Sequence, residues 1–170
     1  TAADEAQIAH LLTLCFGDNF DQRSYLRQRP HLRVIHRDQG QITAHISVLL
    51  RAVRLGPDMV DTAGLAEVCT HPNQRGQGLA SRLLQTAIRH CRTSPAQFVT
   101  LFGIAPLYAG HGFAAHSNIL TFVEMTNTHT TAITTEPAQT LMVLPLRAQL
   151  WPATAPLDMR AGTDTALARV

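Results

Sequence analysis

Residues 72–81 read Pro72-Asn73-Gln74-Arg75-Gly76-Gln77-Gly78-Leu79-Ala80-Ser81 and stand between a predicted strand and a predicted helix. The first N–H groups of a helix have no intrahelical acceptor, and the helix dipole adds positive charge behind them. An anion is therefore favoured at this point of the chain without a dedicated cation. Gly76 and Gly78 lack Cβ atoms, so a diphosphate can approach the main chain closely.

Other glycine-containing loops fit these residues less well. A nucleotide-binding P-loop ends in Gly-Lys-Ser/Thr, which this stretch lacks. A dinucleotide fingerprint places three glycines after the first strand of a repeating βαβ unit, whereas an antiparallel meander precedes this loop. A plain strand-to-helix turn remains the alternative. The side chain of Arg75 either reaches a phosphate oxygen or braces the loop.

The chain before this loop predicts two helices and three strands. Residues 4–16 have helical spacing of apolar residues, with Asp4 as N-cap and Gly17 as the stop. A short helix is expected at about 22–28, since Pro30 bars its continuation. The period then changes to that of an antiparallel meander with strands at 32–37, 41–53 and 60–70.

The chain after the loop predicts a helix and then short elements. The helix covers about 79–91, and a buried strand follows at 98–103. A brief helix near 105–110 and strands at about 118–124 and 140–146 complete the pattern. Six threonines in Thr126–Thr135 indicate either a β-prone loop or a mobile connection. The tail from about 147 reads as irregular.

Composition indicates one globular α/β domain over residues 1–170. Hydrophobic residues make up 45% and charged residues 15%, with a formal net charge of +2. This balance favours neither nucleic acid nor an anionic membrane as partner. No apolar run of about 18 residues and no secretion signal is present, so a soluble protein is expected.

Cysteines and histidines point to a reducing compartment without a metal. Cys15, Cys69 and Cys91 are odd in number and lack zinc or redox spacing, so free thiols in the cytoplasm are expected. His36 and His45 flank a turn and could face each other across a hairpin. Two ligands do not make a metal site, so no metal is expected.

The loop resembles the acyl-coenzyme A cradle of the GNAT superfamily of N-acetyltransferases. That family has Arg or Gln, two residues, Gly, one residue, then Gly or Ala, and Arg75-Gly76-Gln77-Gly78-Leu79-Ala80 matches. The resemblance implies a mixed, mostly antiparallel sheet of six to seven strands, with a splayed central strand and about four helices. It further implies that main-chain amides from Gln74 to Ser81 hold the pyrophosphate of acetyl-CoA. Pantetheine and the acyl group would lie along Val68, Cys69 and Thr70.

A second stretch resembles the next element of the family, a short helix with tyrosine, three residues, then Gly-Phe. It reads Ala105-Pro106-Leu107-Tyr108-Ala109-Gly110-His111-Gly112-Phe113. Phe102 stands where the family often has an asparagine that contacts the cofactor. Pro106 is tolerated only in the first turn of a helix, so this helix must be short.

Acyl transfer requires a base, because an alkylammonium with a pKa near about 10 must lose a proton before it attacks a thioester. Glu67 is the candidate base, directly or through water; otherwise it is a solvated or ion-paired residue. An N–H of Val68 or Cys69 could stabilise the oxyanion. Tyr108 would protonate or position the departing sulfur, or simply pack. His111 reads as structural, and Cys69 lacks the base that a nucleophile needs.

The acceptor is expected to be a small-molecule primary amine. Patches of sequence resemble two GNAT branches that act on amino sugars, the aminoglycoside 2′-N-acetyltransferases and the nodulation-factor N-acyltransferases. The shared patches are Cys15 to Asp18, Arg29-Pro30, Ala44-His45-Ile46, Val143-Leu144-Pro145 and the tail from Trp151-Pro152 through Arg160-Ala161-Gly162. They lie outside the cofactor motifs. A longer acyl donor, a non-catalytic acyl-CoA sensor and a homodimer stay open.

Overall fold

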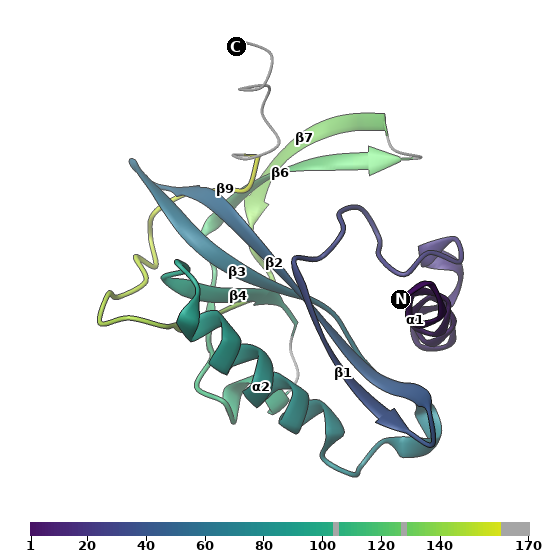
Figure 1. The fold of residues 1–170 in the computed structure, drawn as a ribbon. Helices are drawn as coiled ribbons and strands as arrows, with labels where there is room; N and C mark the ends of the chain where they lie inside the picture. Colours follow the sequence, from purple (N-terminus) through teal and green to yellow (C-terminus); the bar gives the residue numbers. More distant parts are fainter. Residues whose placement is uncertain (104–105, 127–128, 161–170) are drawn as a thin grey trace. The chain divides into compact units, whose positions relative to one another are not determined.

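The computed structural model describes residues 1–103, 106–126 and 129–160 (Figure 1). These residues pack as two compact units. The first comprises residues 1–49 and 64–94, and the second comprises residues 50–63 together with the chain from Pro95. Two long strands, β2 (Gln41–Leu55) and β3 (Asp58–Thr70), run through both units. A single domain over residues 1–170 stays a prediction.

The first unit begins with helix α1 (Ala2–Phe16), which confirms the expected N-terminal helix. Its N-cap is Thr1 rather than Asp4: the Thr1 hydroxyl accepts from the Asp4 N–H, and the Asp4 carboxylate bonds back to Thr1 in a capping box. The helix ends at Gly17, as predicted. Its buried side chains, Ile8, Leu11 and Leu12, pack with Phe20, Ile42 and Cys69.

The expected helix at 22–28 is wrong. A 3₁₀ turn, η1 (Gly17–Phe20), follows α1, and the next residues form turns and bends. Asp21 and Gln22 take positive φ values of 48° and 55°, which no right-handed helix tolerates. The buried Ser24 then bonds the Glu5 carboxylate, so this segment is held by α1 instead of by its own helical bonds.

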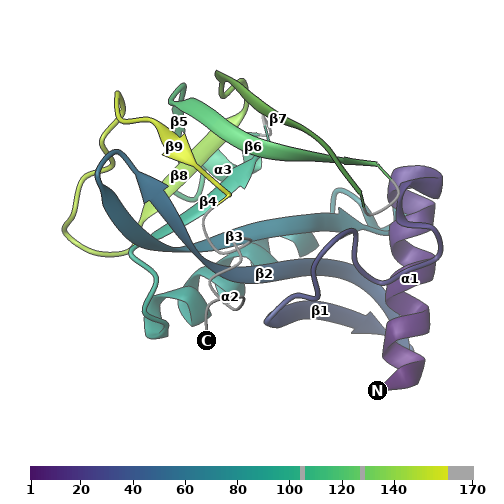
Figure 2. The ribbon, with the colours of Figure 1, turned by 90° about the horizontal axis from the view of Figure 1, so that it is seen from above.

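Strand β1 (Leu32–Asp38) pairs antiparallel with β2, as the meander predicts. His36 does not face His45: in the antiparallel register His36 lies opposite Ala44 and His45 lies opposite Ile35. A register shift falls after His36 and changes only the pairs nearer the turn. The 3₁₀ turn η2 (Pro72–Gln74) follows β3 and leads towards helix α2 (Leu79–Thr93). Figures 1 and 2 show α1 and α2 on opposite faces of the sheet formed by β1, β2 and β3 in this unit.

The second unit is built mainly from short strands. Strand β8 (Leu141–Pro145) pairs antiparallel with both β4 (Phe98–Phe102) and β5 (Ala114–His116). Strands β6 (Ile119–Thr126) and β7 (His129–Pro137) form a hairpin, so most of the threonine-rich segment is a strand. Strand β9 (Leu157–Asp158) pairs parallel with β6 and antiparallel with the end of β2.

The segment after Leu146 contributes to the core of the second unit. Residues 147–156 form neither helix nor strand, yet Trp151 is buried and its indole ring meets Phe98 edge-on, with ring centroids 5.0 Å apart. The Trp151 Nε1–H donates to Asn118 Oδ1 over 2.9 Å. Asn118 in turn donates to the carbonyls of Pro152 and Ala155 over 2.9 and 2.8 Å, so this segment is fixed by buried hydrogen bonds.

The mixed α/β fold class is confirmed. Among the described residues, nine strands form one sheet in the order β5-β8-β4-β3-β2-β9-β6-β7, with β1 beside β2. The count exceeds the expected six to seven because the short strands β5 and β9 give no clear sequence signal, and because the threonine-rich segment forms a strand, β7, and not a loop. The same residues hold three α-helices, α1, α2 and the four-residue α3 (Pro106–Ala109), with two 3₁₀ turns. None of these helices has the length and apolar character that a membrane crossing requires.

Candidate functional site

The predicted anion loop begins as a compact turn. His71 precedes η2, and its Nδ1 accepts the N–H of Asn73 over 3.2 Å. The N–H groups of Gln74 and Arg75 donate to the carbonyls of His71 and Pro72 over 2.9 and 3.4 Å. These two N–H groups are therefore engaged inside the turn, and the groups that remain for an anion start at Gly76.

Gly76 and Gly78 both take left-handed conformations, with φ values of 79° and 72°. Gly78 is the N-cap of α2 and supplies no side-chain cap, and the Arg82 N–H makes the first helical bond, to the Gly78 carbonyl over 3.1 Å. A Cβ on either glycine would meet no protein atom within 4 Å. Glycine is thus required by the backbone conformation, and the space beside it is open to a ligand.

The side chains around this loop fix it to neighbouring segments. Arg75 Nε donates to the Thr70 carbonyl over 3.3 Å, so in this structure the guanidinium braces the loop. Gln74 Nε2 donates to Asp38 Oδ2 in the β1–β2 turn over 2.7 Å. Leu79 is 2% exposed and anchors the first turn of α2 in the core, as its place in the motif predicts. Gln77, Ala80 and Ser81 complete the candidate cradle.

Glu67 has the most unusual backbone of the candidate residues. Its φ is +56°, three residues before the end of β3, and L-residues rarely adopt this conformation. Ser47 Oγ donates to one carboxylate oxygen, and the Leu26 N–H donates to the other over 3.0 Å. Its carbonyl lies 3.1 Å from His45 Nδ1. Glu67 is therefore a half-buried carboxylate held by hydrogen bonds, and not an ion-pair partner in the described residues.

The three residues after Glu67 lie in the same unit as the loop. Cys69 is 8% exposed, and burial, followed by the neighbouring Cys15, raises the pKa of its thiol far above the ordinary value. A protonated buried thiol is a poor nucleophile, in line with the prediction that Cys69 does not attack. The Thr70 carbonyl already accepts Arg75 Nε and lies 3.5 Å from Cys15 Sγ. Val68 is half-buried.

Tyr108 belongs to the second unit, whereas Glu67 and the loop belong to the first. It lies in α3, which is short, as Pro106 demands; Ala105 lies outside the described residues. Its ring packs edge-on to Phe113, with centroids 6.0 Å apart, and is 9% exposed. A Cβ built on Gly103 would lie only 2.9 Å from Tyr108 Cε2. Burial raises the pKa of Tyr108, so its phenol stays protonated.

Sequence reasoning missed the partners of Glu67. Ser47 and His45 lie on β2, and the third donor is the main chain of Leu26. One signal was present: polar side chains at positions 43, 45 and 47 alternate within residues 42–50, which are otherwise apolar, and all three are buried. Buried polar residues at alternate positions indicate a hydrogen-bonded cluster on one face. No local signal identifies Leu26.

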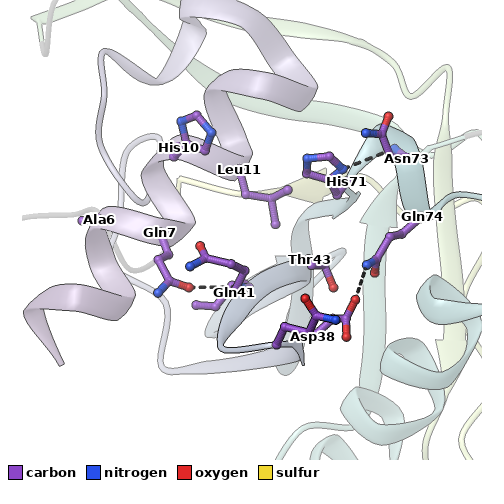
Figure 3. A pocket seen from close by; sticks show the side chains of 12 residues that line it. Ala6, Gln7, His10, Leu11, Asp38, Gln41, Thr43, His71, Asn73 and Gln74 are labelled. Atoms are coloured by element: carbon purple, nitrogen blue, oxygen red, sulfur yellow. Dashed lines mark hydrogen bonds between the residues drawn. The ribbon is translucent and has the colours of Figure 1, made fainter.

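A pocket of about 610 Å³ in the first unit also escaped prediction (Figure 3). It is lined by α1, the β1–β2 turn, the start of β2 and the residues around η2. Several of its polar groups already bond one another: Gln7 Oε1 accepts the Ile42 N–H over 2.8 Å, and Gln74 is bound to Asp38. These bonds make the pocket walls a scaffold for the beginning of the loop.

Sequence comparisons with known proteins point to one family. The model of the acetyltransferase (GNAT) domain matches residues 1–115. YjhQ of Escherichia coli K12, called an uncharacterized N-acetyltransferase, is 32% identical over 85 residues, which is 50% of this chain and 47% of that protein. The match thus spans about half of each chain.

Solved structures share the fold. A GNAT acetyltransferase of Brucella melitensis, in complex with acetyl-CoA, is 19% identical with a TM-score of 0.64, covering 96% of this chain and 94% of its own. Escherichia coli YhbS, in complex with CoA, is 18% identical with a TM-score of 0.65, covering 96% and 88%. At such low identity these likenesses show the fold alone, but the family model covers well over half the sequence. The chain is therefore a member of the GNAT acetyltransferase family.

Proposed function

We propose that this chain transfers an acetyl group from acetyl-CoA to a primary amine of a small molecule. The observation that carries the proposal is the loop at the head of α2. Two left-handed glycines leave open space beside the first turn of a 15-residue helix, which is the geometry that an anionic diphosphate needs. The structural neighbours from Brucella melitensis and Escherichia coli are complexes with acetyl-CoA and CoA, which supports this choice of donor.

The cofactor would be held by main-chain groups of the first unit. The N–H groups of Gly76, Gln77, Gly78, Leu79 and Ala80 would face the diphosphate, and Val68, Cys69 and Thr70 would line the pantetheine. Acetyl-CoA supplies an activated thioester when bound. The Gln74 side chain and Arg75 contribute by holding the loop, through Asp38 and the Thr70 carbonyl.

Glu67 is the proposed base. Its carboxylate accepts one hydrogen bond on each oxygen, from Ser47 Oγ and from the Leu26 N–H, which leaves further lone pairs to accept a proton from the acceptor ammonium, directly or through one water. The two donors fix the orientation of the carboxylate. The following N–H groups, of Val68 or Cys69, are the proposed donors to developing negative charge.

Tyr108 is the proposed acid or positioning group for the departing thiolate. Its assignment rests on the motif spacing and on its protonated, largely buried phenol. The acceptor is proposed to be an amino sugar, on the strength of the shared sequence patches alone. A longer-chain acyl donor and a non-catalytic sensor are the competing functions, and a homodimer and a cytoplasmic location remain separate proposals.

Two measurements test the proposal. Acetyl-CoA at about 100 times its Kd should add about 2.7 kcal/mol to the free energy of unfolding. An amine panel with acetyl-CoA, including amino sugars, aminoglycosides and polyamines, should then release free CoA thiol with some of its members. The sequence contains fourteen arginines and no lysine. Acetylation of the protein's own lysine side chains therefore cannot contribute to the thiol that is released. An unchanged melting curve at millimolar acetyl-CoA would refute the cofactor assignment, and stabilisation without turnover would favour the sensor.

A further inference from the structure

We propose that His45 is a positioning residue that holds the main chain of Glu67 in its left-handed conformation and thereby aims the Glu67 carboxylate. The inference rests on the proposed role of Glu67 as the base. His45 would touch neither substrate nor cofactor. It would act through the carbonyl of the residue that does.

The contact fixes the tautomer of His45. Its Nδ1 lies 3.1 Å from the Glu67 carbonyl oxygen, and a carbonyl can only accept, so Nδ1 carries the hydrogen. The imidazole is 0% exposed, and burial lowers its pKa to about 4. At neutral pH the ring is therefore uncharged, with one donor, and that donor points at Glu67.

Three donors converge on Glu67. His45 bonds its carbonyl, Ser47 bonds one carboxylate oxygen, and the Leu26 N–H bonds the other. A left-handed conformation costs an L-residue about 1–2 kcal/mol, so it persists only where surrounding contacts require it. The bonds to the carboxylate restrain the side chain, whereas the bond from His45 acts on the peptide group itself. His45 is therefore the partner best placed to fix φ and ψ at residue 67.

A purely structural histidine fits the same position poorly. His45 Nε2 is buried and has no hydrogen-bond partner among the described residues, and Arg33 Nε on the neighbouring strand shares this condition. A buried acceptor without a donor costs about 1–3 kcal/mol, and an apolar side chain would avoid that cost. The strained backbone and the unsatisfied nitrogen thus occur at the same contact. Two unfavourable features at one point are typical of a functional site.

The variants His45→Asn and His45→Leu test the inference. The asparagine amide can place an N–H donor where Nδ1 lies, while leucine fills the space without a donor. We expect His45→Leu to lower kcat by about 10²-fold, the usual effect of a misplaced catalytic group. The Kd for acetyl-CoA should stay unchanged, and His45→Asn should recover most of kcat. His36→Leu is the matched control, because it removes a histidine hydrogen bond of 2.9 Å, to Thr43, on the same pair of strands. It should leave kcat unchanged.

A spectroscopic measurement tests this inference separately from the proposed function, because it does not require the protein to be enzymatically active. Long-range ¹H–¹⁵N spectra of the wild-type imidazoles, assigned with His45→Asn, should show His45 as the neutral Nδ1–H tautomer at pH 7. An Nε2–H tautomer would overturn the proposal even if His45→Leu failed to fold, because Nδ1 could not then donate to Glu67. Wild-type kcat in a folded His45→Leu would overturn it as well. An inactive wild-type protein with the expected tautomer would instead count against the proposed function.

Discussion

Replacing Gly78 by alanine tests the candidate cradle most directly. Its φ is +72°, and a Cβ there would meet no protein atom within 4 Å, so the methyl group adds no clash inside the protein. The cost is conformational, about 1–2 kcal/mol for an L-residue held in the left-handed region. In a protein of this size each kcal/mol lowers Tm by about 2–4 °C. If the loop keeps its conformation, Tm should therefore fall by about 2–8 °C.

The same free energy can instead appear in ligand binding. If the loop of Gly78→Ala relaxes to a negative φ, acetyl-CoA must restore the left-handed conformation when it binds. A cost of 1–2 kcal/mol then raises Kd by about 5–30-fold, and the methyl group adds to this if it occupies space that the diphosphate needs. Thermal unfolding and isothermal titration with acetyl-CoA, on the same samples, measure both quantities.

Gly40→Ala is the matched control. Gly40 has a φ of +83° and the same open surroundings, but it lies in the β1–β2 turn. We expect a similar loss of Tm with an unchanged Kd. The reasoning fails if Gly78→Ala binds acetyl-CoA and unfolds as the wild type does, or if both variants weaken binding equally.

Three further predictions concern other residues of the site. Glu67→Gln should lower turnover by about 10²–10⁴-fold with the acetyl-CoA Kd unchanged; thiol release at the wild-type rate would remove Glu67 as the base. Gly103→Ala would bring a methyl group within 2.9 Å of Tyr108 Cε2, so the ring must move, at a cost of about 1–3 kcal/mol in thermal unfolding. A wild-type Tm would show that the ring packs elsewhere. His45 in the folded state has a pKa of about 4, below its value of about 6.5 in the unfolded chain, so the unfolded chain takes up the proton first as pH falls. The stability contributed by neutral His45 is complete above pH 6.5 and is lost between pH 6.5 and 4, by about 3 kcal/mol. Arg33 and Glu5 carry the charges that act on His45, and the Glu67 carbonyl bonds its ring. Denaturation at pH 7 and 4.5 should therefore show a smaller difference for His45→Asn.

The loop between β3 and α2 could be located from sequence because its signals are local. Two glycines between a strand and a strongly amphipathic helix mark it, and the structure adds that both glycines take left-handed conformations. The helices around the loop follow in the same way from apolar spacing. The expected helix at 22–28 failed for the opposite reason. Its pattern was short, and the left-handed Asp21 and Gln22 and the contacts of Ser24 with α1 outweigh a weak helical preference.

The conformation of Glu67 could not be predicted. Ala66, Glu67 and Val68 read as ordinary strand residues, and a glutamate carries no local demand for a positive φ. The groups that bond Glu67 lie far away in sequence, 20 to 41 residues back at Ser47, His45 and Leu26. Sequence could name the carboxylate from its place in the chain. It could not show that two donors hold the carboxylate and a third bonds the Glu67 carbonyl, because two of these three contacts involve main-chain atoms.

The donor from the segment before β1 is the main-chain N–H of Leu26, so the side chain at this position can change while the hydrogen bond to Glu67 remains. The N–H of residue 26 reaches Glu67 whatever its side chain is, and the Leu26 side chain is itself 40% exposed. Substitutions at this position can therefore change the surface beside the proposed base without removing the bond that orients it. Proline is the exception, because it lacks the N–H. The orientation of the carboxylate thus depends on the main chain at residue 26 and not on its side chain. An acceptor bound beside the proposed base would meet that side chain.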